Sequence, residues 1–229
     1  ETRKNLVIPL LTLLVAFPFG ILVAGPFGNW MAEWLHRGIM ALCGFSPVLM
    51  GVLIGGLWQV LVSVGIHGII TVLAFADVLA GNSSPLLALS YSASFAVSGV
   101  AFAVFMRSRN SGEKQTAKAG AVSAIMGATE PAMYALIKPD KKRFALCCAG
   151  GALGGATAGF FGISMHAYAG MGITGLFGFF QTGDVKLVGV LLMAVLPFGF
   201  TWLIEMLLYR QEKAVESEEI IVMPVNGSV

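Results

Sequence analysis

The residues with the clearest chemical potential in this sequence are Glu130 and Pro131, which interrupt an apolar, Gly/Ala-rich stretch. A carboxylate at the centre of a membrane helix costs about 2.5–3.5 kcal/mol on insertion scales, and proline removes a backbone donor and breaks a helix. Irregular backbone at membrane depth is tolerated only where it is buried in protein or lines a polar cavity. The pair therefore predicts a substrate site, with Glu130 accepting hydrogen bonds or a proton from solute hydroxyls and Thr129 adding a donor and an acceptor. The alternative is a buried acid that is protonated or neutralised by a neighbouring lysine.

A second group of polar residues, Gln59, Ser63 and His67, is spaced four apart in an apolar run. On one helix this spacing forms a polar stripe facing one way. We interpret the stripe as facing a solute or water, although a lone histidine on an apolar face is more often a core residue. His166 follows a glycine-rich run and either lines the same cavity or marks a helix end at the interface.

Composition defines the class of protein. Of the 229 residues, 57% are hydrophobic and 11% are charged, against about 25% charged residues in soluble domains. The sequence therefore predicts an all-α integral membrane protein, and its net charge of +2 is too small to indicate a nucleic-acid partner. Cys43, Cys147 and Cys148 lie in apolar runs without His or Cys at metal spacing, and no nucleotide-binding or hydrolase motif is present. We expect neither a metal nor a cofactor.

The apolar runs predict about five or six membrane segments, since a spanning helix needs about 20 apolar residues. These runs are residues 5–27, 46–76, 85–106, 119–137, 144–163 and 185–209. The run 46–76 is long for one span and predicts either a bent helix or a span followed by an extended segment. Residues 29–42 mix tryptophans with charges at helical spacing, which is typical of an amphipathic helix at the interface. The glycines of residues 150–162 predict closely packed helices.

Basic residues flank the Glu130-Pro131 segment on both sides, at residues 107–118 and 138–143. Because basic loops are usually cytoplasmic, the segment between them should enter the membrane and return, as a re-entrant hairpin with Glu130-Pro131 at its tip. Asp184 and Glu205, near the ends of apolar runs, are expected to face water or headgroups. Residues 1–212 are expected to form the membrane domain, and residues 213–229 a polar, disordered cytoplasmic tail.

The sequence GATEPAMYA at residues 127–135 resembles the signature G-I-T-E-P-A-hydrophobic-Y-G of a transporter family. That family is the membrane-spanning IIC component of bacterial sugar phosphotransferase systems, here the sucrose/β-glucoside branch of its glucose superfamily. The family's G-L-W-Q run ending in histidine, its basic stretch and its glycine-rich helix are also matched, in order, by residues 56–67, 141–144 and 149–159. The resemblance covers residues 6–209, and the number of segments makes the chain similar to the C-terminal part of such a domain.

This resemblance implies an elevator-type sugar permease in the bacterial inner membrane, working as a homodimer with two re-entrant hairpins. By position, Glu130 and His67 would bind the hydroxyls of a β-glucoside or related disaccharide with support from Thr129, and Glu130 is a candidate general base. A IIB partner supplied by the IIA–HPr phosphorelay would donate phosphate from a cysteine that this chain lacks, so its own standing as an enzyme stays open. Two alternatives remain: a proton-coupled secondary transporter in which Glu130 and His67 relay protons, and a truncated, non-transporting membrane protein.

Overall fold

The computed structural model describes residues 2–180 and 186–209, and the regular secondary structure in this part of the chain is helical apart from one isolated bridge between Ser84 and Met165. Four helical runs among these residues are long and apolar enough to cross a membrane: Pro47–Val64, Pro85–Arg107, Lys141–Phe161 and Leu187–Leu208. This architecture confirms a polytopic all-α membrane protein, while the count of five or six segments stays a prediction. Asp184 and the tail at 213–229 lie outside the described residues.

The helices follow one another with short connections. In chain order they are α1 (Thr2–Phe19), the π-helical turn η1 (Gly20–Ala24), α2 (Gly25–Phe45), α3 (Pro47–Val64), α4 (His67–Leu79), α5 (Pro85–Tyr91), α6 (Ala93–Arg107), α7 (Ser111–Ile125), α8 (Glu130–Ala132), the π-helical turn η2 (Met133–Ile137), α9 (Lys141–Phe161), the 3-10 helix η3 (Gly172–Phe179) and α10 (Leu187–Leu208).

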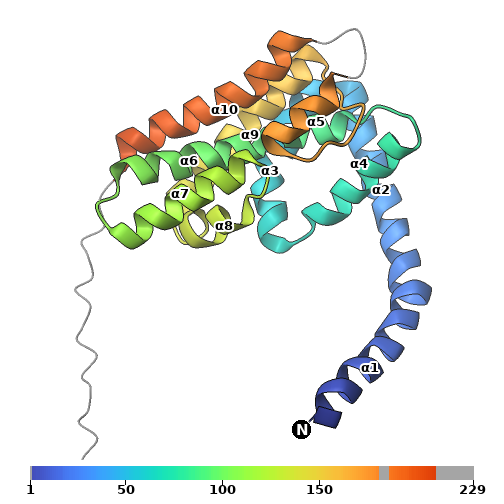
Figure 1. Cartoon of the computed structure of the whole chain (residues 1–229). Coiled ribbons are helices and arrows are strands. Elements are labelled where there is room, and N and C mark those ends of the chain that lie inside the picture. Colours follow the sequence, from blue (N-terminus) through green and yellow to red (C-terminus); the bar gives the residue numbers. More distant parts are fainter. Residues whose placement is uncertain (1, 181–185, 210–229) are drawn as a thin grey trace, which may run out of the picture.

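The N-terminal helices α1, η1 and α2 form one curved arm that runs away from the rest of the molecule (Figure 1). Pro18 lies just before η1, and a proline inside a helix removes a backbone hydrogen bond and bends it. Large apolar side chains along the arm, Leu14 and Leu22 among them, are exposed, as expected of a surface that meets lipid. The predicted interfacial helix at residues 29–42 lies within α2, and its position at a membrane surface stays a prediction.

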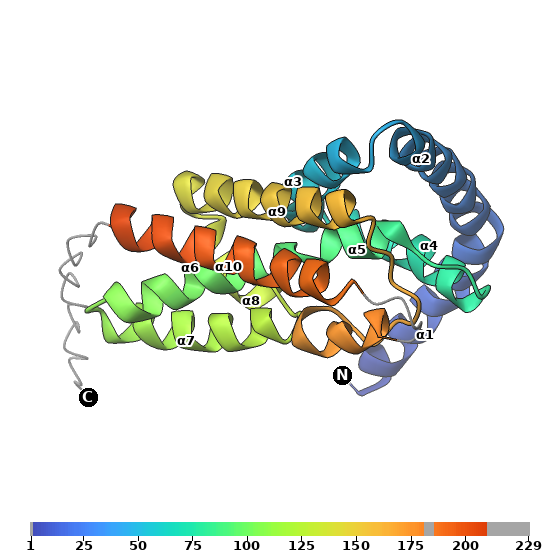
Figure 2. The same ribbon diagram turned by 90° about the horizontal axis from the view of Figure 1, so that it is seen from above.

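The remaining helices form a bundle around α5 and α6. Almost all of the run Pro85–Arg107 is buried, because α3, α7, α9 and α10 pack around it. In the view from above, α6, α7, α9 and α10 run alongside one another (Figure 2). The central helix therefore holds the surrounding elements in place, and its N-terminal end reaches the site described below.

Glycines bring α3 and α9 into backbone contact. A Cβ added to Gly51 would collide with the carbonyl oxygen of Gly155, and one added to Gly55 would collide with that of Gly151. Such close approach is how small residues stabilise helix pairs in membranes, where dispersion replaces the hydrophobic effect. The predicted role of the glycines at residues 150–162 is confirmed.

The long apolar run at 46–76 forms two helices, α3 and α4, joined by a turn, rather than one bent helix or a span followed by an extended segment. Ser46 caps α3 by accepting a hydrogen bond from the Leu49 amide at 3.2 Å. Gly65 ends α3 with a φ of 87°, a left-handed conformation that favours glycine. The chain then turns, and α4 begins at His67.

The segment that carries Glu130 and Pro131 reverses the direction of the chain. Helix α7 begins at the cap residue Asn110, residues 126–129 make the turn, and α8 and η2 return toward the start of α7 (Figure 1). Arg143, which follows the returning leg, lies 3.4 Å from Glu113 in the first turn of α7. The chain thus follows the course of the predicted hairpin, and its entry into a membrane stays a prediction.

Polar side chains join the two ends of this hairpin to α10, in a group that we call the Arg143 cluster. Its members are Arg143, Glu113, Asp140, Glu205, Ser108 and Tyr209. The Arg143 Nε lies 3.0 Å from the Glu205 Oε1, and Glu113 Oε2 accepts hydrogen bonds from Ser108 Oγ at 2.7 Å and from the Tyr209 hydroxyl at 3.0 Å.

The expectation that Glu205 faces water or headgroups is therefore wrong. Its side chain is only 7% exposed, because Arg143 on the neighbouring α9 supplies an opposite charge inside the protein. A buried carboxylate is tolerated when it is both paired and hydrogen-bonded.

Candidate functional site

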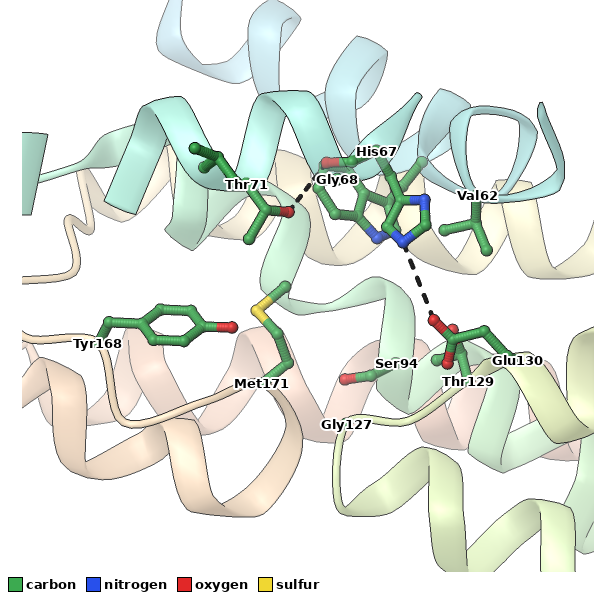
Figure 3. Close-up of a pocket in the computed structure, with 12 residues that line it drawn as sticks. Val62, His67, Gly68, Thr71, Ser94, Gly127, Thr129, Glu130, Tyr168 and Met171 are labelled. Carbon is green, nitrogen blue, oxygen red and sulfur yellow. Dashed lines mark hydrogen bonds and ion pairs between the residues drawn. The ribbon is translucent and has the colours of Figure 1, made fainter. Parts of the chain in front are cut away.

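A cavity of about 340 Å³ lies where the hairpin tip meets α3, α4 and the start of α6 (Figure 3). This volume falls within the roughly 300–1,000 Å³ usual for small-molecule sites. The lining residues are Trp58, Val62, His67, Gly68, Thr71, Val72, Ser94, Gly127, Thr129, Glu130, Tyr168 and Met171. Segments far apart in the sequence thus build one cavity, in which polar groups stand among apolar side chains.

Glu130 and His67 face each other across this cavity (Figure 3). The His67 Nε2 lies 3.8 Å from the Glu130 Oε1, and 52% of the glutamate side chain is exposed. Among the described residues, no other side chain pairs with this carboxylate. The distance is longer than a hydrogen bond of about 2.7–3.2 Å, so both groups remain available to a solute.

Local structure explains where each partner lies. The break at Gly65 allows α4 to begin at His67, whose carbonyl oxygen accepts a hydrogen bond from Thr71 Oγ1 at 3.0 Å. The His67 ring meets the edge of Trp58 at a centroid distance of 6.2 Å, and its buried Nδ1 has no partner among the described residues. On the other side, Pro131 lies in the first turn of α8, where its missing N–H costs nothing, and Glu130 opens that turn.

Two hydroxyl-bearing residues complete the polar end of the cavity. Thr129 is buried in its wall directly before Glu130, as the sequence predicted for its position. Ser94, at the start of α6, lines the wall and donates to the Tyr91 carbonyl oxygen at 3.0 Å. The arrangement offers a carboxylate, an imidazole and two hydroxyls to a polyhydroxylated solute.

The hairpin tip is held by close backbone contact with the loop before η3. Gly127 and Gly172 have φ angles of 105° and 68°, and a Cβ on Gly172 would collide with the backbone of residues 125–127. The hydroxyl of the buried Tyr91 donates to the Gly172 carbonyl oxygen. Tyr91 and Gly172 thereby link the central helices to the segment that positions Glu130.

Three residues that the sequence placed at the site do not line the cavity. Gln59 is fully buried and donates to the Ala93 carbonyl oxygen at 3.1 Å. Ser63 bonds back to its own helix at Val60, and His166 lies in the loop after α9, where its backbone N–H donates to Gly178. The break at Gly65 prevents the stripe of Gln59 and Ser63 from continuing to His67.

Other lining residues were not singled out as site residues from the sequence. They are Trp58, Thr71, Ser94, Tyr168 and Met171. Thr71 follows His67 by four residues, so the two share one face of a helix that begins at His67. The sequence alone does not show that a helix begins there. Tyr168 lies two residues beyond His166 in the same loop, and it lines the cavity whereas His166 does not.

Comparison with known proteins identifies the family that this chain resembles. Residues 4–151 match the family model "Phosphotransferase system, EIIC". The chain is 32% identical over 184 residues to the beta-glucoside-specific EIIBCA component of Halalkalibacterium halodurans, covering 80% of this chain and 29% of that protein. It is 29% identical over 216 residues to the arbutin-, cellobiose-, and salicin-specific EIIBC component of Escherichia coli, covering 93% of this chain and 44% of that protein.

A third relative, the sucrose-specific EIIBC component of Salmonella typhimurium, is 28% identical over 205 residues, covering 87% of this chain and 44% of that protein. The chain thus spans less than half the length of these relatives, and no solved structure matches it. The family model covers well over half of the chain, and it includes His67 and the Glu130 signature. The chain belongs to the EIIC family of the phosphotransferase system, in the sucrose/β-glucoside branch of its glucose superfamily.

Proposed function

We propose that this chain is the sugar-translocating part of a phosphotransferase-type transporter for a β-glucoside or a related disaccharide, in the bacterial inner membrane. One observation carries the proposal: the carboxylate of the EIIC signature and His67 face each other across a cavity at a chain reversal. The names of the relatives support the sugar class. Homodimerisation and elevator movement are proposed from the family resemblance alone.

In this proposal Glu130 accepts hydrogen bonds from sugar hydroxyls while His67 binds a neighbouring hydroxyl. Because 3.8 Å separates the two groups, a hydroxyl can approach both without breaking a strong ion pair. Thr129 and Ser94 would bind further hydroxyls from the same wall. Gln59 and Ser63, away from the cavity, would support the fold of α3 rather than contact the sugar.

The phosphoryl group would come from the cysteine of a IIB domain, a partner that the EIIBC names of the relatives support. The sugar hydroxyl oxygen attacks phosphorus, the phosphorus–sulfur bond breaks and the cysteine leaves as a thiolate. Glu130 takes the hydroxyl proton as general base. Much of the rate enhancement in phosphoryl transfer comes from positioning, which the cavity would supply.

The hairpin would re-enter the membrane from the cytoplasmic side. Its two ends meet at the Arg143–Glu113 pair, which supports a common side for the basic residues at 107–118 and 138–143. The exposed carboxylate at the tip would then reach membrane depth inside a cavity, where irregular backbone is tolerated.

The test is uptake of labelled β-glucosides, sucrose and trehalose that depends on phosphoenolpyruvate, in membranes carrying the full-length gene product. Glu130→Gln should abolish uptake, because a neutral amide neither accepts the proton nor binds as strongly. Glu33→Gln is the matched control, since Glu33 lies on the exposed surface of α2 and, among the described residues, pairs only with Arg37. Uptake that needs no phosphoryl donor and stops when the proton gradient collapses would instead establish the proton-coupled alternative.

A further inference from the structure

The cavity has two ends of different chemistry. Glu130 and Thr129 lie at one end, while Tyr168 and Met171 lie toward the other (Figure 3). Val72 of α4 adds an aliphatic side chain to the lining. The proposed sugar chemistry uses the first end and leaves the second unassigned.

Tyr168 is held in place from behind by an aromatic contact. Its ring meets Phe75 of α4 at a centroid distance of 5.1 Å and an interplanar angle of 61°, and 38% of the residue remains exposed. Its hydroxyl points into the cavity in Figure 3. A supported ring with a free surface is suited to packing against a ligand group.

Met171 adds an adaptable apolar contact beside this ring. Its backbone is pressed against Gly127 at the hairpin tip, so its position is coupled to that of the loop carrying Glu130. A thioether side chain adjusts to irregular shapes and makes favourable contacts with aromatic rings. The Tyr168–Met171 end therefore fits an apolar and preferably aromatic group.

The shape of a glucoside makes the two ends complementary. In a pyranose ring, the C4 and C6 hydroxyls lie on the side opposite C1. If Glu130 and His67 bind the hydroxyls of that edge, the substituent on C1 points away from them. A β-linked substituent leaves the ring in its mean plane and so extends along the cavity, whereas an α-linked one bends out of it.

We propose that the Tyr168–Met171 end of the cavity is an aglycone subsite, which selects β-glucosides carrying an aryl group on C1. This inference rests on the proposed function, because it needs a glucosyl unit bound at Glu130. It assigns substrate preference to Tyr168 and Met171, neither of which would contact the hydroxyl that is phosphorylated.

The experiment compares methyl and phenyl β-glucoside, which differ only in the aglycone, by the concentration of each that half-saturates binding to membranes carrying the full-length gene product. Tyr168→Ala should raise that concentration by ~10-fold for the phenyl compound and by less than about 2-fold for the methyl compound, because only the phenyl group contacts the ring. Tyr168→Phe, which keeps the ring, should preserve the preference for phenyl. The matched control is Phe177→Ala, which removes an exposed aromatic ring of η3 outside the cavity.

Two further variants keep the test decisive if Tyr168→Ala does not fold. Tyr168→Leu keeps apolar bulk without a ring, and Met171→Gln keeps length without apolar character, so each should lower the preference for phenyl by ~3-fold or more. An unchanged ratio of the two affinities in these variants would overturn the aglycone subsite alone. Binding of neither glucoside to the unmodified protein would overturn the proposed function and this inference with it.

Discussion

The hairpin carries charged residues at its tip and at its base, and the two places differ in how those charges are satisfied. At the tip, Glu130 is half exposed and lies 3.8 Å from His67, its one partner in the part of the chain that the structure describes. At the base, Arg143 pairs with Glu205 at 3.0 Å and with Glu113 at 3.4 Å, and these side chains are largely buried. A buried charge must be paired to be tolerated, whereas a carboxylate left accessible and loosely paired is free to bind a ligand. The comparison separates a structural ion cluster from a candidate binding site.

The sharpest way to test this difference is to make the same change at both places. Glu130→Gln should reduce sugar uptake by more than about 100-fold and leave the unfolding temperature of the detergent-solubilised protein unchanged, because it removes a charged acceptor that no protein group requires. Glu205→Gln should do the opposite, lowering the unfolding temperature while any folded protein still binds sugar. If both variants lost stability equally, the tip would be as structural as the base.

Replacing the arginine at the base of the hairpin should cause the next largest effect, a loss of stability. Arg143→Met leaves the buried Glu205 carboxylate without its counter-ion, and removing one partner of a buried pair typically costs about 3–5 kcal/mol. The double variant Arg143→Met/Glu205→Leu should recover part of this loss, since it removes the unpaired charge as well. The measurement is thermal unfolding of the purified protein, and a double variant less stable than Arg143→Met would contradict the pairing.

A smaller effect is expected from loosening the support of the tip. Gly172→Ala places a Cβ at a φ of 68° against the backbone of residues 125–127, and an L-residue in this conformation costs roughly 1–2 kcal/mol. The tip should shift, so sugar affinity should fall by ~10-fold with little change at the base. Gly81→Ala is the control, because Gly81 has a φ of 82° outside the cavity lining and a Cβ there meets open space; equal loss of affinity in both variants would contradict this support of the tip.

The smallest effect should come from one hydrogen bond at the edge of the Arg143 cluster. Tyr209→Phe removes the donor to Glu113 Oε2, a bond of 3.0 Å, while Ser108 still donates to the same oxygen at 2.7 Å. The expected loss is about 0.5–1.5 kcal/mol of stability, with no change in sugar affinity. A loss of affinity in this variant would show that the base and the tip are coupled.

Several features of this protein follow from local patterns in the sequence. Apolar run lengths predict the spans at residues 85–106 and 144–163, which the structure contains as α5–α6 and α9. The glycines of α9 predict backbone contact with a neighbouring helix, because only residues without a side chain permit it. The cost of a carboxylate and a proline in an apolar run singles out Glu130, and the family signature around it leads to the EIIC family.

Only the tertiary structure decided which side chains share the cavity. The polar stripe that begins at Gln59 depends on one unbroken helix, and the left-handed turn at Gly65 rotates His67 away from it and toward Glu130. The position of Glu205 near the end of an apolar run predicts a water-facing residue, whereas the structure pairs it with Arg143, 62 positions earlier in the chain. Tyr168 becomes a lining residue because the loop after α9 lies beside α4, where its ring packs against Phe75. Local sequence patterns predict the period of a helix and the cost of a charge, but the rotation of each helix and its distant partners are set by packing.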